Sequence, residues 1–230
     1  MWLKVSIVLL MIDSIIELSL ISSMVAWLNL TASQSAWQFT IAGATYSVSG
    51  LPKKLIVDHG HTSNGAAGTA FVVVALGGLL ALCLRHVSDR REGRGRLAAH
   101  GSWLYHAWLS LSILALFLTT GALAYVFTLA NSHAGQRIDT LEVASLNSNS
   151  PYSLLSWTPQ AWLSAVLRLD LVRRRREIRS QLAIMNGWQY NLIVMFLIQL
   201  SQTVLALVEY FSWRNHRKRT MTPMIAAFIG

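Results

Sequence analysis

Residues 11–20 read MIDSIIELSL and place two acidic side chains, Asp13 and Glu17, inside an apolar run from about 3 to 28. A run of this length can cross the hydrocarbon of a bilayer as one helix. A charged side chain near the bilayer centre costs roughly 2.5 to 3.5 kcal/mol, so such residues usually face a protein interior. Residues four apart share one helix face. The stretch therefore predicts a spanning helix whose acidic face is turned towards other helices.

The rest of the chain supplies partners for this helix. Hydrophobic residues make up 53% of the 230 residues and charged residues only 13%, which is far from a soluble composition. Three further apolar runs are long enough to span a bilayer, at 66–85, 103–130 and 189–213. We expect one all-α membrane domain, 1–230, built as a bundle of four transmembrane helices.

Basic residues set the expected orientation. They gather in the segment 86–102 and in the tail 214–230, and positive charge beside spanning helices favours the cytoplasmic side. With four crossings, both termini are then cytoplasmic, and 29–65 and 131–188 are outer loops. The net charge of +9 lies beside apolar runs, which favours contact with lipid headgroups and argues against a nucleic-acid partner.

The first outer loop predicts a small luminal cap. Residues 37–41 and 45–49 each alternate apolar and polar side chains around a Gly-Ala break, a pattern typical of a β-hairpin. Residues 55–57 are candidates for a third strand.

The second outer loop carries a basic block, Arg173–Arg176 with Arg179, that conflicts with the charge rule. A fifth crossing at 152–172 would remove the conflict, but Pro159 and two charged residues disfavour it. We therefore expect an interfacial amphipathic helix in this segment, with Trp162 and Val166 on its apolar face.

Asp58-His59-Gly60-His61 is the densest group of reactive side chains. On an extended segment, alternate histidines point the same way, so His59 and His61 could contact a substrate, with Asp58 or Asn64 adding an oxygen. Two histidines alone form a weak metal site, because zinc needs further ligands, and no metal or cofactor is expected. The alternative is a helix start with solvated histidines, capped by Ser63 or Asn64.

Polar residues inside the other predicted helices could meet Asp13 and Glu17. Gln199 and Gln202 lie midway along the fourth helix, and His106 lies near the inner end of the third. The set is consistent with hydrogen bonds between helices, with a buried acid-base site, or with contact to a partner subunit. Small residues would allow close helix packing along the second helix: Ala66, Ala70, Gly77, Gly78 and Ala81.

Three stretches carry a resemblance: DHGHTSNGAAGT at 58–69, SWTPQAW at 156–162 and MNGWQYN at 185–191. Together they resemble small, uncharacterised four-helix membrane proteins of filamentous fungi, some of which accompany genes for polyketide or polyketide-peptide biosynthesis. The resemblance implies a part in natural-product assembly in the endoplasmic reticulum or another endomembrane. The architecture is also similar to claudin-type tetraspan proteins, with Trp37 in place of their loop tryptophan, although their paired cysteines are absent.

Two functions follow as expectations. The first is a cofactor-independent enzyme, or a subunit working with a second membrane chain, that cyclises a lipophilic intermediate by acid-base and shape catalysis. Asp13, Glu17, Asp58, His59 and His61 would be its catalytic groups. Its substrate contacts would be Asn64, His106, Gln199 and Gln202. The alternative is a non-catalytic tetraspan scaffold or adaptor.

Overall fold

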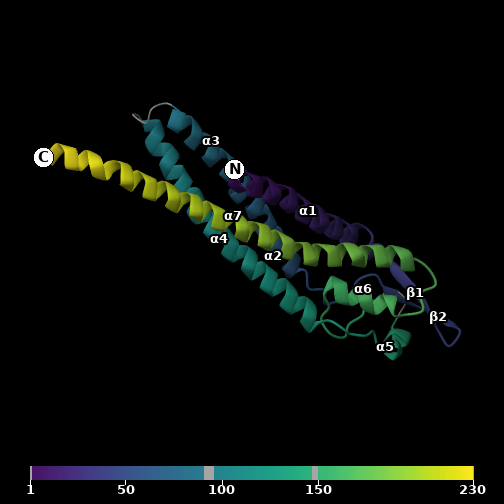
Figure 1. Cartoon of the computed structure of the whole chain (residues 1–230). Coiled ribbons are helices and arrows are strands. Elements are labelled where there is room, and N and C mark those ends of the chain that lie inside the picture. The colour runs from purple at the N-terminus through teal and green to yellow at the C-terminus, as the bar shows by residue number, and fades with distance from the viewer. Residues whose placement is uncertain (1, 91–95, 147–149, 230) are drawn as a thin grey trace. The chain divides into compact units, whose positions relative to one another are not determined.

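The computed structural model describes residues 2–90, 96–146 and 150–229, with side-chain surroundings over 2–87, 103–146 and 150–215 (Figure 1). Part of the predicted basic loop, 91–95, and of the second outer loop, 147–149, therefore lies outside the described residues. Within the described residues, four helices are long and apolar enough to cross a membrane. They are α1 (Trp2–Leu30), the continuous run of α2 (Asp58–Thr69), π-helical Ala70–Leu76 and α3 (Gly77–Arg90), then α4 (Arg96–Ser132) and α7 (Arg175–Ile229). This confirms a mostly helical protein with four candidate spans and indicates an integral membrane protein.

The helices extend beyond the apolar runs that predicted them. α2 begins at Asp58 rather than near 66, and α7 begins at Arg175 rather than near 189. The reason is that hydropathy marks the length of the hydrocarbon crossing, whereas a helix continues wherever its backbone hydrogen bonds can form. Residues 58–65 and 175–188, expected in outer loops, are therefore helical.

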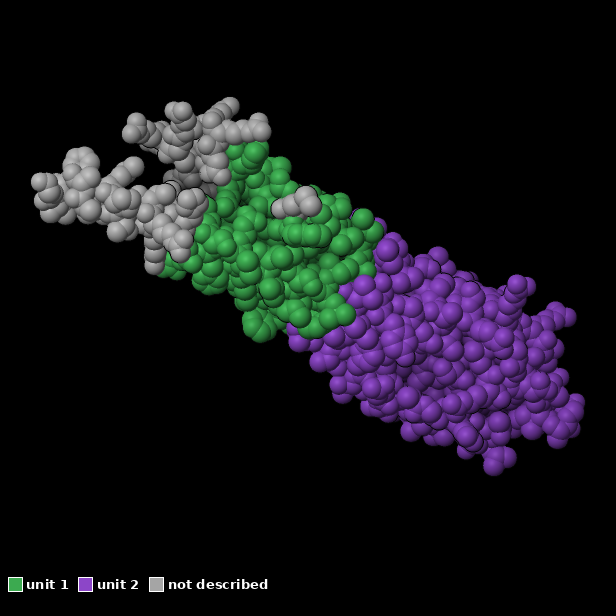
Figure 2. Space-filling view, in the orientation of Figure 1, with its two compact units in different colours: residues 1–14, 68–118, 195–230 green, residues 15–67, 119–194 purple. Residues whose placement is uncertain are grey.

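The chain forms two compact units, and each of the four long helices contributes to both (Figure 2). Unit 1 contains residues 1–14, 68–118 and 195–230. Unit 2 contains 15–67 and 119–194, and therefore holds the hairpin and the shorter helices.

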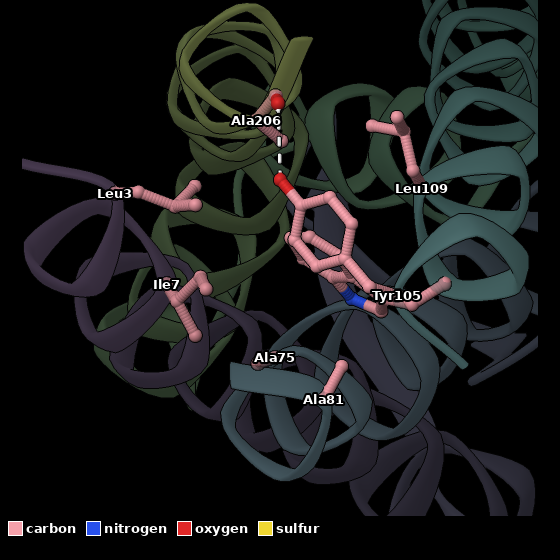
Figure 3. Close-up of a cluster of buried hydrophobic side chains, with 8 residues drawn as sticks. Leu3, Ile7, Ala75, Ala81, Tyr105, Leu109 and Ala206 are labelled. Atoms are coloured by element: carbon pink, nitrogen blue, oxygen red, sulfur yellow. Dashed lines mark hydrogen bonds between the residues drawn. The ribbon is translucent and has the colours of Figure 1, made fainter. Parts of the chain in front are cut away.

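The core of unit 1 is built around two aromatic residues of α4 (Figure 3). Tyr105 donates its hydroxyl hydrogen to the Ala206 carbonyl oxygen of α7 at 3.2 Å. Trp108 donates its indole N–H to the Val74 carbonyl oxygen at 3.0 Å. A β-carbon on Gly78 would lie 2.8 Å from the Trp108 ring. The small residue expected to allow close packing therefore makes room for an indole of the same unit.

Unit 2 contains the predicted β-hairpin. Strands β1 (Ala36–Ile41) and β2 (Ala44–Ser49) pair antiparallel, and the turn residues Ala42 and Gly43 both have positive φ angles, 48° and 82°. Two positive φ angles are typical of the tight hairpin turns whose twist matches that of the strands. The hairpin lies beside two short helices, α5 (Thr140–Ser145) and α6 (Pro159–Leu167) (Figure 1).

The Gly50 carbonyl oxygen joins the hairpin to α6. It accepts the indole N–H of Trp37 at 3.1 Å and that of Trp162 at 2.8 Å. A side chain at position 50 is excluded, because a β-carbon there would lie 1.9 Å from the Ala32 carbonyl oxygen. Two further aromatic rings, Tyr152 and Trp157, pack against Trp162 at centroid distances of 5.8 and 5.2 Å.

These contacts correct two expectations about the loops. The segment 152–172 forms only the short helix α6, and its side chains at Trp162 and Val166 are fully buried in protein instead of lying on a membrane surface. Seven of the nine residues of α6 are buried, and Trp162 packs on the aromatic residues of unit 2. Residues 55–57 do not form a third strand either, since Leu55 makes a single isolated bridge to Trp157.

The basic block has a structural role at the end of α6. Arg175 donates to the carbonyl oxygens of Leu167 at 3.1 Å and Leu169 at 2.8 Å. Arg174 donates to the Ser35 hydroxyl at 2.9 Å. The last carbonyls of a helix have no partner within it, so Arg175 supplies a donor to the carbonyl of Leu167, the last residue of α6. The charge rule concerns the orientation of spanning helices. It does not consider arginines that bind protein carbonyls, as Arg175 does.

Candidate functional site

Residues 58–61 are the first turn of α2 rather than an extended segment. In a helix, alternate residues point in different directions, so His59 is fully buried whereas His61 and Asp58 are exposed. The expectation that the two histidines share one face is therefore wrong. The alternative interpretation, a helix start, is correct for the backbone. It is wrong in two details, because His59 is buried and not solvated, and because α2 begins at Asp58, before Ser63 and Asn64.

His59 has one occupied and one open ring nitrogen. Its Nε2 lies 3.4 Å from the Oε1 atom of Gln160 on α6. Its ring packs against the indole of Trp188 on α7, with 5.3 Å between centroids and 51° between planes. No hydrogen-bond partner for the buried Nδ1 occurs among the described residues, nor for the buried Nε2 of Gln160. Each of these two side chains thus has one buried nitrogen without a partner in the described part of the chain.

Glu17 anchors a buried hydrogen-bond network that includes Trp188. The Ser63 hydroxyl donates to Glu17 Oε1 at 3.0 Å and accepts the Trp188 indole N–H, also at 3.0 Å. Asn191 donates its side-chain N–H to Glu17 Oε2 at 2.9 Å. A buried carboxylate is stable in a protein interior when it is hydrogen-bonded in this way. Because Ser63 lies one turn after His59, the network also fixes the indole on which His59 packs.

A pocket of about 550 Å³ lies against His59. Its walls come from α1 between Ile21 and Asn29, from residues 51–57, from the start of α2 and from Pro159. The lining is mostly apolar, with a few polar groups: Ser22, Asn29, His59, His61 and Asn64. An apolar cavity of this size with few polar groups is typical of sites for small molecules. The lining of this pocket thus includes His59, His61 and Asn64.

The remaining candidates lie elsewhere. Asp13, Gln199 and Gln202 are buried and, like His106, belong to unit 1. His106 packs edge-on against Tyr210, with 5.3 Å between the ring centroids. The pocket is lined by unit 2 alone, so these four residues do not line it. Over the described residues, no group of three or more His, Cys, Asp or Glu side chains is placed to hold a metal ion.

Two residues important for the site were missed by sequence reasoning, Gln160 and Trp188. One signal for Gln160 was available, because it is an amide in a short helix that is otherwise apolar apart from Ser164. No local pattern marks Trp188 as a neighbour of His59.

Comparison with known proteins gives no further guide, because no protein-family model, curated protein or solved structure matches this chain.

Proposed function

We propose that this protein is a membrane-embedded enzyme, or a subunit of one, that transforms a lipophilic small molecule by acid-base and shape catalysis. The observation that supports the proposal is the pocket of about 550 Å³ with the buried His59 on its wall. Histidine is the commonest general acid and base in enzymes. An apolar pocket adds control over the conformation in which a flexible substrate reacts.

The open polar atoms favour a ligand site over a purely structural role. Leaving a buried donor or acceptor without a partner costs about 1–3 kcal/mol, and such groups in native proteins call for an explanation. A ligand that pairs with Nδ1 of His59, whose side chain lines the pocket, would remove this cost for that atom. The neighbouring Glu17 network contrasts with it, because there Trp188 donates to the Ser63 hydroxyl, and Ser63 donates to the carboxylate.

Cyclisation of a polyketide-derived intermediate is the finer form of the proposal, and it rests on the sequence resemblance. Ring closure between two parts of one molecule needs no redox cofactor when it proceeds by proton transfer. The same resemblance favours an endomembrane location and a second membrane chain as partner.

The test uses deletion of the gene in the source organism and complementation with variants. His59→Phe keeps an aromatic ring beside Trp188 but removes both nitrogens, and we expect it to abolish the product that the wild-type gene restores. The matched control is His86→Phe, which replaces an exposed histidine of unit 1 and should leave product formation unchanged. Mass spectrometry of cell extracts gives the readout, and the amount of each variant in the membrane fraction shows whether it folds.

Full product formation by a well-expressed His59→Phe variant would contradict the proposal. If deletion nevertheless abolished the product, the scaffold alternative would be favoured, especially if another membrane protein were lost from the membrane fraction of the deletion strain.

A further inference from the structure

We propose that the pocket opens sideways into the bilayer, and that its substrate is an amphiphile, a lipophilic molecule with one hydrogen-bonding end, which enters from the surrounding lipid. The apolar part of this molecule would lie in the groove between α1 and α2, and its polar end would bind His61 and Asn64. This inference rests on the proposed function and specifies its substrate class and the route by which the substrate arrives.

The floor of the pocket lies where α1 approaches α2. A β-carbon on Gly60 would meet the Met24 Cε atom at 3.5 Å, so Met24 packs over the glycine. The buried apolar lining on this floor comes from α1: Ile21, Met24 and Leu28. An apolar ligand on this floor would gain binding free energy, because its surface is removed from water along with the floor.

The rim of the pocket is exposed on both helices. The exposed lining residues are Ser22, Val25, Ala26 and Asn29 of α1, and His61 and Asn64 of α2. Val25 keeps 40% of its surface accessible. Because the exposed residues lie along the sides of two neighbouring helices, a ligand can enter between them.

The surface that surrounds this opening suits lipid. Both helices belong to candidate membrane spans, Trp2–Gln34 and Asp58–Val87. Ile15 is 45% exposed, and it lies on the same face of α1 as Ser22 and Ala26. Exposed apolar surface of this kind marks contact with a membrane. A lipophilic molecule dissolved in the bilayer would therefore meet the opening without passing through water.

His61 and Asn64 supply the polar contact. They lie three residues apart in α2 and so share one face of the helix. Both are exposed and both line the pocket, whereas His59 is fully buried. An imidazole and a side-chain amide can each donate and accept a hydrogen bond, and a polar group that faces hydrocarbon has no water to bind. A hydroxyl, carbonyl or carboxyl group at the end of the ligand would pair with them.

The first experiment uses a long-chain fatty alcohol that carries a diazirine in its chain and an alkyne at its end. It is added to membranes that contain the full-length protein, and mass spectrometry locates the crosslinks after illumination. We expect labelling within 21–29 and 51–64 that an excess of unmodified fatty alcohol suppresses. Labelling around Leu197 on α7, which is 53% exposed, should persist, because contact with bulk lipid does not saturate. Pocket labelling that the excess alcohol leaves unchanged would overturn the site.

The second experiment closes the opening. Val25→Trp places an indole at the rim, and Val8→Trp adds the same ring at an equally exposed position of α1 in unit 1. We expect Val25→Trp to lower pocket labelling about tenfold at equal protein amount, because a ligand must displace the indole before it binds. Val8→Trp should label like the wild type. Equal labelling of the two variants would overturn entry between α1 and α2 and leave the proposed function intact, which is contradicted instead by normal product formation in His59→Phe.

The third experiment tests the polar end of the ligand. Asn64→Leu removes the amide and keeps a side chain of similar size. We expect its labelling by the fatty alcohol to fall about threefold to tenfold, the effect of one lost hydrogen bond. Labelling by the matching hydrocarbon probe, which lacks the hydroxyl, should not fall. An unchanged ratio of the two probes would overturn the assignment of the polar end.

Discussion

At the scale of single residues, alanine substitutions at two adjacent glycines of α3 should change the stability of the protein in opposite directions. A β-carbon on Gly78 would lie 2.8 Å from Trp108 Cζ2, whereas one on Gly77 would meet Trp108 Cδ1 at an ordinary 3.6 Å. We expect Gly78→Ala to destabilise the protein by about 1–3 kcal/mol, as overpacking does. Gly77→Ala should be neutral or stabilising, because alanine favours a helix by about 0.5–1 kcal/mol over glycine. Thermal unfolding of the detergent-solubilised variants, followed by circular dichroism, compares them. Equal midpoints would contradict the packing of Trp108 on Gly78.

The candidate site was partly predictable at this scale. His59 was identified because reactive side chains cluster in the motif at 58–61, and it does line a pocket. Its partners were not identified, because Gln160 is 101 residues away in sequence and local patterns carry no information about such contacts. The burial of His59 beside an exposed His61 depends on where α2 begins, which is the least certain part of any helix predicted from sequence.

At the scale of elements, Tyr152 should make the stability of unit 2 depend on pH, because it is bonded to the start of α5. Its hydroxyl oxygen accepts the backbone N–H of Asp139, the N-cap of α5, at 3.0 Å. Burial raises the pKa of Tyr152 above its usual value of 10. Because the folded pKa exceeds the unfolded one, folding favours the neutral phenol. Its contribution to stability is present below about pH 10 and is lost as the pH rises further.

Replacing Tyr152 with Phe tests this coupling. The variant should lose about 1 kcal/mol at neutral pH, because the Asp139 N–H loses its acceptor, and should show a smaller loss of stability than the wild type as the pH rises above about 10. Tyr190→Phe, which removes an exposed hydroxyl on α7, is the control and should keep the wild-type pH dependence. Unfolding midpoints across this range give the measurement, and parallel curves for Tyr152→Phe and wild type would contradict the prediction.

The elements themselves were predictable to different degrees. The four long helices followed from apolar length, and the hairpin followed from alternation around Gly43. The polar start of α7, from Arg175 to Asn186, was missed because it lies outside the apolar run. α6 was expected at a membrane surface because amphipathic periodicity shows that one face is apolar without showing whether lipid or protein covers it. In this chain Trp157 and Tyr152 cover it.

At the scale of the whole molecule, the number of candidate spans predicts the membrane topology. The described residues contain four candidate spans; this even number predicts that both termini lie on one side, and the basic segments 86–102 and 214–230 favour the cytoplasm. Tags at either end should therefore be digested by protease added to the cytoplasmic face of sealed vesicles, whereas a tag inserted at the hairpin turn, Ala42–Gly43, should be protected. Protection of only one terminus would contradict four crossings.

The shared carbonyl of Gly50 also sets an order of events during synthesis. Its two indole donors are 13 and 112 residues away along the chain, so the hairpin can form early but α6 cannot dock until Trp162 has left the ribosome. At about 5–20 residues per second, that interval lasts roughly 6 to 22 seconds. During this time the nascent first loop exposes the surface that later contacts Trp162, and a chain truncated before residue 162 would expose it permanently to chaperones and degradation.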